Sequence, residues 1–230
     1  ASVSRKAIWI RAASNLFLGM AIGLLGYYGL TNALGDLAQR QIREEAPDVA
    51  PFRVRDPNEL LGQSAPGAPG DLPFDFTGWE AEDRAYWEAL EIGGAFGRIV
   101  IPAMDLDVMV VKGADLTSLR KGPGWITWTD LPGPTGRAGI SGHRSTYSGP
   151  FQHLELLVEG ETVDFYSPYR RYRYVVTNSV IVLPTAVEIV ASTDEPTLAL
   201  TACHPPWGNE FRIVAEADLV EVRRMTEAEE

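Results

Sequence analysis

The chain has 230 residues, of which 45% are hydrophobic and 22% are charged, and its formal net charge is −11. This length suits one globular domain with additional segments. This composition excludes a fully disordered chain, a collagen-like repeat and a multi-span membrane protein. The acidic balance argues against duplex nucleic acid as a partner, because binding it requires a basic face. The single cysteine, Cys203, excludes an internal disulfide framework.

The first thirty residues predict a membrane anchor. Residues 12–30 contain no charged side chain, and as a helix they would be about 29 Å long, close to the thickness of the hydrocarbon core. The cations Arg5, Lys6 and Arg11 precede this stretch and acids follow it. The positive-inside rule therefore leaves the N-terminus in the cytoplasm and exports the rest of the chain. A cleaved signal peptide, with a site at 31–33, and a buried core helix are the alternatives.

The next sixty residues are typical of a stalk. A helix could continue out of the membrane as far as Pro47, after which proline and glycine recur too often for regular structure. The aromatic stretch 79–92 predicts a helix that docks on the following domain, with substrate gating as the alternative. We therefore divide the chain into an anchor at 1–30, an extracytoplasmic stalk at 31–91, a folded domain at 92–222 and an acidic tail at 223–230.

From residue 92 onward, short apolar and β-branched runs alternate with glycine and proline turns. One helical turn is predicted at 115–119, where an acid precedes leucine-spaced residues. Roughly seven or eight strands with few helices favour a closed, mostly antiparallel β-barrel, because closure removes exposed strand edges. The predicted strands are a hairpin of 98–102 and 106–111, then 138–141, 161–166, 172–176 with 180–183, 197–202 and 211–215.

Three residues at strand ends could carry chemistry. Cys203 follows the apolar run 198–202; a lone cysteine is usually an inert buried residue, but an unpaired thiol in an exported protein is prone to oxidation and calls for a use. His143 ends another apolar run, so the two can meet at one rim of the barrel as a pair for thiol nucleophilic catalysis. Arg212 lies on the next strand, where its guanidinium could stabilise an oxyanion or simply be solvated.

Four stretches of the sequence together resemble one family. They are Arg98-Ile99-Val100-Ile101-Pro102, then Gly122-Pro123-Gly124-Trp125 before Leu131-Pro132-Gly133, then Ser141-Gly142-His143-Arg144 with Pro150-Phe151, and Leu200-Thr201-Ala202-Cys203. Residues 98–215 resemble a sortase, a membrane-anchored cysteine transpeptidase that joins surface proteins to the cell wall or to one another. The resemblance implies a sortase-like eight-stranded barrel behind a transmembrane helix, and it maps His143, Cys203 and Arg212 onto the family's His, Cys and Arg.

The sequence also departs from the family pattern. Sortases commonly have the sequence Thr-Leu-any-Thr-Cys, with one threonine four residues before the cysteine and one immediately before it. Both threonines are alanine here, at 199 and 202. The change at Ala202 bears on substrate preference, and we expect Thr201, Ala202 and His204 to lie at the substrate site. The short nine-residue gap from Cys203 to Arg212, and Asn58 where a lid would carry an aromatic, favour a housekeeping-like class E type without a lid.

The resemblance implies a reaction as well as a fold. Cys203 would attack a threonine carbonyl in a C-terminal sorting signal of the Leu-Pro-any-Thr-Gly kind and form a thioacyl-enzyme. A primary amine from a peptidoglycan precursor or a pilin lysine, or else water, would resolve it, with Arg212 on the oxyanion and His143 moving the proton. A membrane-bound cysteine endopeptidase and a non-catalytic tethered β-barrel scaffold are the alternatives.

No metal site is predicted. One cysteine and three scattered histidines give no ligand-pair spacing for zinc, and His153 is predicted to be structural. Some sortases bind calcium through loop acids, but acids are also the default surface residues. The acids available for calcium are Asp105, Asp107, Glu155, Glu159, Glu161 and Asp164.

Overall fold

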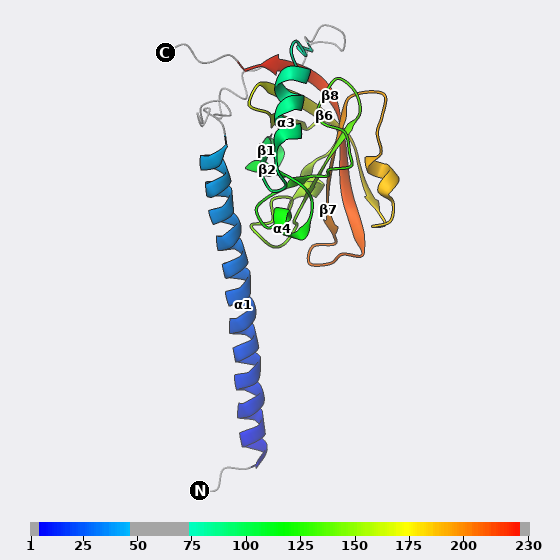
Figure 1. Cartoon of the computed structure of the whole chain (residues 1–230). Helices are drawn as coiled ribbons and strands as arrows, with labels where there is room; N and C mark the ends of the chain where they lie inside the picture. Colours follow the sequence, from blue (N-terminus) through cyan, green and yellow to red (C-terminus); the bar gives the residue numbers. More distant parts are fainter. Residues whose placement is uncertain (1–4, 47–73, 226–230) are drawn as a thin grey trace.

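The computed structural model describes residues 5–46 and 74–225, which form a closed eight-stranded β-barrel with a long N-terminal helix beside it (Figure 1). The strand order around the barrel is β1-β2-β3-β4-β7-β8-β6-β5. Neighbouring strands are antiparallel except for β2 with β3 and β4 with β7, which are parallel. The predicted closed, mostly antiparallel barrel is confirmed. The strands are β1 (Ala95–Ile101), β2 (Leu106–Lys112), β3 (Gly124–Trp125), β4 (Arg137–Gly142), β5 (Thr162–Tyr166), β6 (Arg170–Val182), β7 (Thr197–His204) and β8 (Phe211–Arg224).

Three strands differ from the predicted ones. β6 is a single strand where the sequence predicts two, because polar Thr177 and Asn178 interrupt the apolar pattern but the chain continues through bulges next to β8. β8 is much longer than 211–215, since it pairs with β7 in its first half and with β6 along its whole length. β3 has only two residues between glycine-rich turns, which is too short for its pattern to be read from the sequence.

Short helical segments join the strands. Asp115 caps α4 (Leu116–Leu119), because its carboxylate accepts hydrogen bonds from the backbone N–H groups of Thr117 and Ser118. The predicted helical turn at 115–119 is therefore present. The other segments are η1 (Glu80–Arg84), α3 (Ala85–Ala89), η2 (Pro102–Met104), η3 (Leu154–Leu156) and η4 (Val187–Val190).

An aromatic cluster fills the end of the barrel against which η1 and α3 pack. The rings of Trp87 and Phe96 stack with centroids 5.0 Å apart, and Phe96 stacks in the same way on Trp125. Phe165 and Tyr172 complete the cluster, and the Trp87 side chain is fully buried. The predicted docking of the aromatic segment before the barrel is thus present, and apolar burial of this size makes it part of the core.

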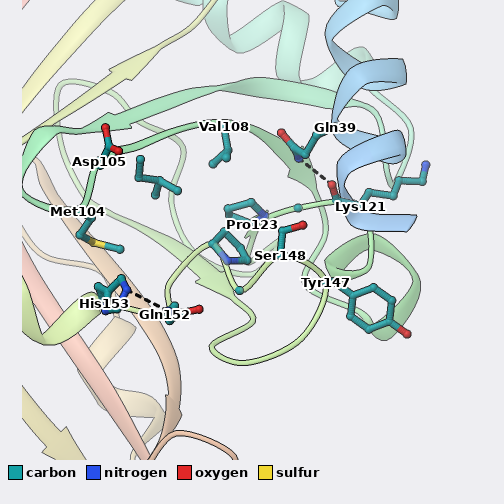
Figure 2. Close-up of a pocket in the computed structure, with 14 residues that line it drawn as sticks. Gln39, Met104, Asp105, Val108, Lys121, Pro123, Tyr147, Ser148, Gln152 and His153 are labelled. Atoms are coloured by element: carbon teal, nitrogen blue, oxygen red, sulfur yellow. Dashed lines mark hydrogen bonds between the residues drawn. The ribbon is translucent and has the colours of Figure 1, made fainter. Parts of the chain in front are cut away.

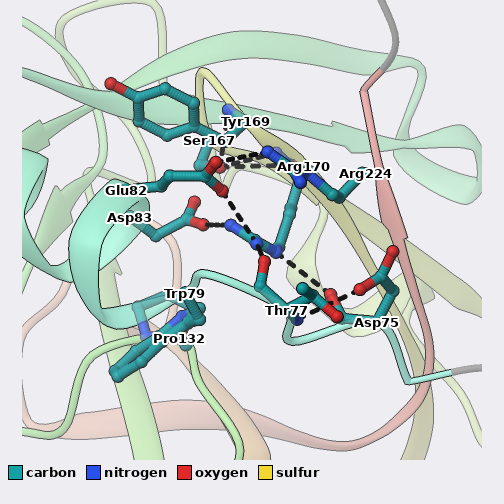
Figure 3. A network of polar contacts seen from close by, with 10 residues as sticks. All are labelled: Asp75, Thr77, Trp79, Glu82, Asp83, Pro132, Ser167, Tyr169, Arg170 and Arg224. Carbon is teal, nitrogen blue, oxygen red and sulfur yellow. Dashed lines mark hydrogen bonds and ion pairs between the residues drawn. The ribbon is translucent and has the colours of Figure 1, made fainter.

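A polar network ties the same segment to the barrel (Figure 3). Arg170, at the start of β6, is fully buried and forms ion pairs with Asp83, which is also fully buried, and with Glu82 at 2.9 Å. Its guanidinium also donates to the carbonyl oxygens of Asp75, at 3.0 Å, and Thr77. Arg170 therefore closes the end of the barrel that is far from the β7–β8 loop.

The N-terminal helix α1 (Arg5–Glu45) has 41 residues. It contains an apolar window with a mean hydropathy of 1.3, none of which is buried within the described parts of the chain, and it is long and apolar enough to cross a membrane. The helix passes residues 30 and 31, where the anchor and stalk were divided, without a break. The prolines and glycines of 47–73 and the tail at 226–230 lie outside the described residues, so the division into four segments stays a prediction.

Candidate functional site

Three strands bring the predicted catalytic residues together at one rim of the barrel. The parallel pairing of β4 with β7 places Gly142 opposite Ala202. The next residues are therefore neighbours, with His143 just past the end of β4 and Cys203 still within β7. The antiparallel pairing of β7 with β8 places Cys203 directly opposite Arg212. The strand order thus makes neighbours of His143 and Cys203, which are 60 positions apart in the sequence.

The alternation of side chains sets the direction in which these residues point. Leu198, Leu200 and Ala202 belong to the core inside the barrel, whereas Ala199 packs outside it against η4. Cys203 follows the same alternation as Ala199 and therefore lies on the outer face. Arg212 shares that face, since residues directly opposite in an antiparallel pair point to the same side.

His143 is half-buried, and its surroundings disfavour its charged form. The centroids of the His143 and Tyr147 rings are 5.1 Å apart. The Arg120 guanidinium lies over the Tyr147 ring, 5.9 Å from its centroid. Burial, with a smaller contribution from the Arg120 charge, lowers the pKa of His143. Its Nε2 atom is buried and has no hydrogen-bond partner among the described residues. A buried imidazole nitrogen of this kind can exchange a proton with a bound group.

Arg212 is held by the loop that precedes it. Its Nη1 donates to the carbonyl oxygens of Asn209, at 3.1 Å, and Phe211, at 2.9 Å. A guanidinium carries five N–H donors, and both of these bonds leave from the same nitrogen. The guanidinium can therefore be held on the β7–β8 loop through Nη1 while its other N–H groups donate to a carbonyl oxygen beside Cys203.

An apolar groove begins beside this rim. It has a volume of about 240 Å³ and runs from Arg212 and Thr201 towards the β6–β7 connection, which contains η4. Its polar side chains are Ser141, Thr201 and Arg212. Its remaining lining residues are apolar: Ala114, Ile126, Trp128, Val182, Leu183, Pro184, Ala186, Val187, Ile189, Val190 and Val214.

The three predicted substrate-site residues do not share one surface. Thr201 lines the groove, whereas Ala202 belongs to the core. The Nδ1 atom of His204 lies 3.1 Å from Nη1 of Arg144, so Nδ1 accepts this hydrogen bond because a guanidinium can only donate. Arg144 is buried and also pairs with Glu155 at 2.5 Å.

The contacts that support the loop after Cys203 were not predicted from the sequence. Arg144 directly follows His143, so the two strand-end loops are joined by Arg144 to His204 as well as by the Trp207 N–H, which donates to Ser145 Oγ at 3.0 Å. The sequence does show Arg144 directly after His143 and His204 directly after Cys203. No spacing rule, however, predicts which loop partner each one contacts.

Three of the six acids considered for calcium, Asp107, Glu155 and Asp164, are paired with arginines. Asp107 forms a bidentate pair with Arg98, and Asp164 forms one with Arg173. Among residues 5–46 and 74–225, no group of three or more His, Cys, Asp or Glu side chains is arranged to hold a metal ion. His153 is exposed, and its Nε2 lies 2.9 Å from the Gln152 side chain.

The second half of α1 packs beside the loop that follows His143. Asn32 accepts from the Ser148 N–H at 2.9 Å, and Asp36 accepts from the Ser148 hydroxyl at 2.5 Å. One turn further on, Gln39 crosses to the backbone of Met109 and Lys121 (Figure 2). These contacts enclose a pocket of about 220 Å³ between the helix, β2 and the loop. The helix predicted to be a stalk thus forms a wall of the domain.

The structure is a closed barrel that carries a cysteine, a histidine and an arginine at one rim. Residues 99–220, more than half of the chain, match the family model of the sortase domain. The chain belongs to the sortase family.

Individual relatives are distant. Sortase D of Bacillus subtilis (strain 168) is 28% identical over 127 residues, which cover 55% of this chain and 62% of that protein. The chain spans about three fifths of the length of the curated relatives it matches. The structure of sortase E from Streptomyces avermitilis is 26% identical, with a TM-score of 0.54, and the match covers 59% of this chain and 93% of that one. A Clostridium perfringens Sortase D5 transpeptidase shares the fold, with a TM-score of 0.59 at 15% identity over 82% of this chain and 99% of that one.

Proposed function

We propose that this chain is a sortase-type cysteine transpeptidase with Cys203 as nucleophile, His143 as proton-transfer group and Arg212 as oxyanion-stabilising group. The observation that carries the proposal is the strand pairing, in which Cys203 lies opposite Arg212 and His143 follows the residue opposite Ala202. A nucleophile, a base and a cation at one rim of a barrel are the minimum for acyl transfer through a thiol.

The reaction takes two steps. The Cys203 thiolate adds to the substrate carbonyl carbon, and the Arg212 guanidinium donates to the oxygen on which negative charge develops. The C–N bond then breaks, protonated His143 gives its proton to the departing amine, and a thioester remains on Cys203. In the second step an incoming primary amine gives a proton to His143, attacks the thioester and releases the thiolate, which restores an amide bond.

The substrate we propose is a surface or pilin protein with a C-terminal sorting signal of the Leu-Pro-any-Thr-Gly kind. The apolar groove that ends at Thr201 and Arg212 would take the apolar residues of the signal and leave its threonine carbonyl beside Cys203. A peptidoglycan precursor or a pilin lysine would supply the amine. We propose a housekeeping-like class E type, although the sortases that this chain resembles are named A and D as well as E.

We further propose that residues 12–30 of α1 span the cell membrane and that the barrel lies on its extracytoplasmic side. The cations before the apolar stretch and the acids after it support this orientation. The segments 1–30, 31–91, 92–222 and 223–230 would then be anchor, stalk, catalytic barrel and tail. The helical start of the stalk, residues 31–45, packs on the barrel.

Two other functions use the same barrel. A membrane-bound cysteine endopeptidase would pass through the same thioester but release it only to water. A tethered scaffold would carry Cys203 as an inert thiol. The buried, unpartnered Nε2 of His143 favours catalysis over the scaffold, because a structural histidine is normally hydrogen-bonded when buried.

A thiol-reactive probe separates enzyme from scaffold. Because Cys203 is the only cysteine, the labelling rate of the intact chain reports on this residue alone. We expect fast labelling that slows markedly in His143→Ala, since loss of the imidazolium removes stabilisation of the thiolate. His153→Ala is the matched control and should not alter the rate. Slow labelling that is equal in all three proteins would support the scaffold.

The pH profile of peptide cleavage should respond to Arg120. The profile of kcat/KM is expected to be bell-shaped, with limbs that belong to the coupled Cys203 and His143 pair. Arg120 lowers the pKa of His143 and so reduces the fraction of imidazolium at neutral pH. Arg120→Gln should therefore raise this pKa, move the acid limb to higher pH and raise the plateau. Lys121→Gln removes the same charge at the next position and should leave the acid limb in place; equal shifts in both variants would contradict the account.

A further inference from the structure

The catalytic rim and the apolar half of α1 lie at the same end of the barrel. In Figure 1 the loop between β7 and β8 (orange) is at the end towards which the N-terminal half of α1 (blue) extends. The contact is direct, because the ring of Trp207 in this loop lies 5.7 Å from the ring of Tyr28 on α1, between centroids. Cys203 precedes this loop and Arg212 follows it.

The height of this contact along α1 can be estimated from the helix rise. The proposed span ends at residue 30, and Tyr28 lies two residues before that end, or about 3 Å along the axis. Trp207 therefore lies level with the boundary between hydrocarbon and headgroups. Trp and Tyr are the residues that concentrate at this boundary, because their rings are apolar with one polar edge.

The loop has the side chains for such a position. Trp207 is 73% exposed and Phe211 is 41% exposed, and both adjacent prolines, Pro205 and Pro206, are exposed as well. Glu210 is the one acid between residues 204 and 211. Leu116 of α4, which lies at the same end of the barrel, is 74% exposed. An apolar surface of this kind on an otherwise acidic chain calls for a covering partner.

We propose that the β7–β8 loop is a membrane-contacting surface, with Trp207 inserted among the lipid headgroups beside Tyr28. The inference rests on the proposed anchor, because the anchor fixes the barrel at the bilayer. The partner is the lipid interface itself, and α1 supplies the continuity between span and loop. Cys203 then works immediately above the membrane surface, and the substrate's scissile bond has to reach it there.

Spin labels on the full-length chain in phosphatidylcholine–phosphatidylglycerol liposomes test the proposal without any activity assay. Cys203→Ala gives a cysteine-free chain, into which single cysteines are placed by Pro206→Cys in the loop, Gly23→Cys in the proposed span and Tyr169→Cys at the far end of the barrel. Collision rates with oxygen and with a water-soluble nickel chelate are then compared. We expect the collision rate with oxygen to be much higher than that with the nickel chelate at position 23, and higher at position 206. At position 169 the collision rate with the nickel chelate should be the higher one.

Adding Trp207→Ser to the Pro206→Cys chain should shift the label at 206 towards the nickel reagent, because the anchoring ring is lost. If position 206 behaves like 169 while 23 is lipid-exposed, the anchor stands and the membrane-contacting loop is wrong. If position 23 is also exposed to nickel, both the anchor and the loop contact are overturned. A label at 206 that is lipid-exposed but insensitive to Trp207→Ser would overturn the role of that ring.

Discussion

Cys203→Ala is expected to abolish cleavage of a sorting-signal peptide. The chain has no other thiol, so nothing can take over as nucleophile, and neither His143 nor Arg212 can form the acyl-enzyme alone. The measurement is the initial rate of peptide cleavage by the purified full-length chain, compared with the unaltered protein. Turnover that survives in this variant would mean that the reaction does not pass through Cys203.

The two partners of Cys203 are expected to matter nearly as much. His143→Ala and Arg212→Ala should each lower the rate by a factor on the order of 10² to 10⁴, as is typical for loss of acid–base or oxyanion assistance. Arg212→Lys should restore little, because an ammonium does not reproduce the planar fork. His153→Ala is the control, since this exposed histidine lies outside the rim. Near-normal turnover in Arg212→Ala would assign the oxyanion role elsewhere.

The largest effect on stability is expected at the buried ion pair of Arg170 and Asp83 (Figure 3). Arg170→Met keeps most of the hydrocarbon chain but leaves the fully buried Asp83 carboxylate without its cation. Removing one partner of a buried pair costs about 3–5 kcal/mol, because the remaining charge is no longer compensated. Urea denaturation of the detergent-solubilised chain, followed by tryptophan fluorescence, should show a correspondingly lower midpoint.

Two further variants identify the cause of that loss. Adding Asp83→Asn to Arg170→Met should recover part of the stability, because it removes the uncompensated charge. Arg84→Met, on the same helical segment, breaks exposed pairs with Glu80 and Glu88 and should have a much smaller effect. A midpoint for Arg170→Met no lower than that of Arg84→Met would show that the buried pair does not hold this segment to the barrel.

Much of the barrel could be predicted because its strands carry their own signal. Residues 98–102, 106–111 and 197–202 are largely apolar runs between turn residues. All of them lie in strands of the structure except Pro102, which begins η2. The full length of β8 could not be predicted, because its second half alternates charged residues such as Glu221 and Arg223 with apolar ones and is stabilised by pairing with β6. Pairing between distant strands overrides a weak local pattern.

The candidate site divides in the same way. His143, Cys203 and Arg212 stood out because each is a chemically capable residue next to an apolar strand. The residues around them did not, since Tyr147 beside His143 and Arg144 on His204 depend on how loops fold over the rim. The packing of Asn32 and Asp36 of α1 against Ser148 was likewise hidden, because polar residues after an apolar stretch indicate only a solvated helix.

Transpeptidation requires that the acyl group on Cys203 is passed to an amine. The most direct measurement is the product ratio at saturating sorting-signal peptide, with oligoglycine, a diaminopimelate-containing peptide and a lysine peptide supplied in turn. Both products derive from a common thioester, so we expect one of these amines to convert cleavage into ligation. The ligated share should rise with the concentration of that amine, while total consumption of peptide continues. If every amine leaves only the hydrolysed acid, transpeptidation is contradicted, and the chain is a cysteine endopeptidase on a sortase barrel.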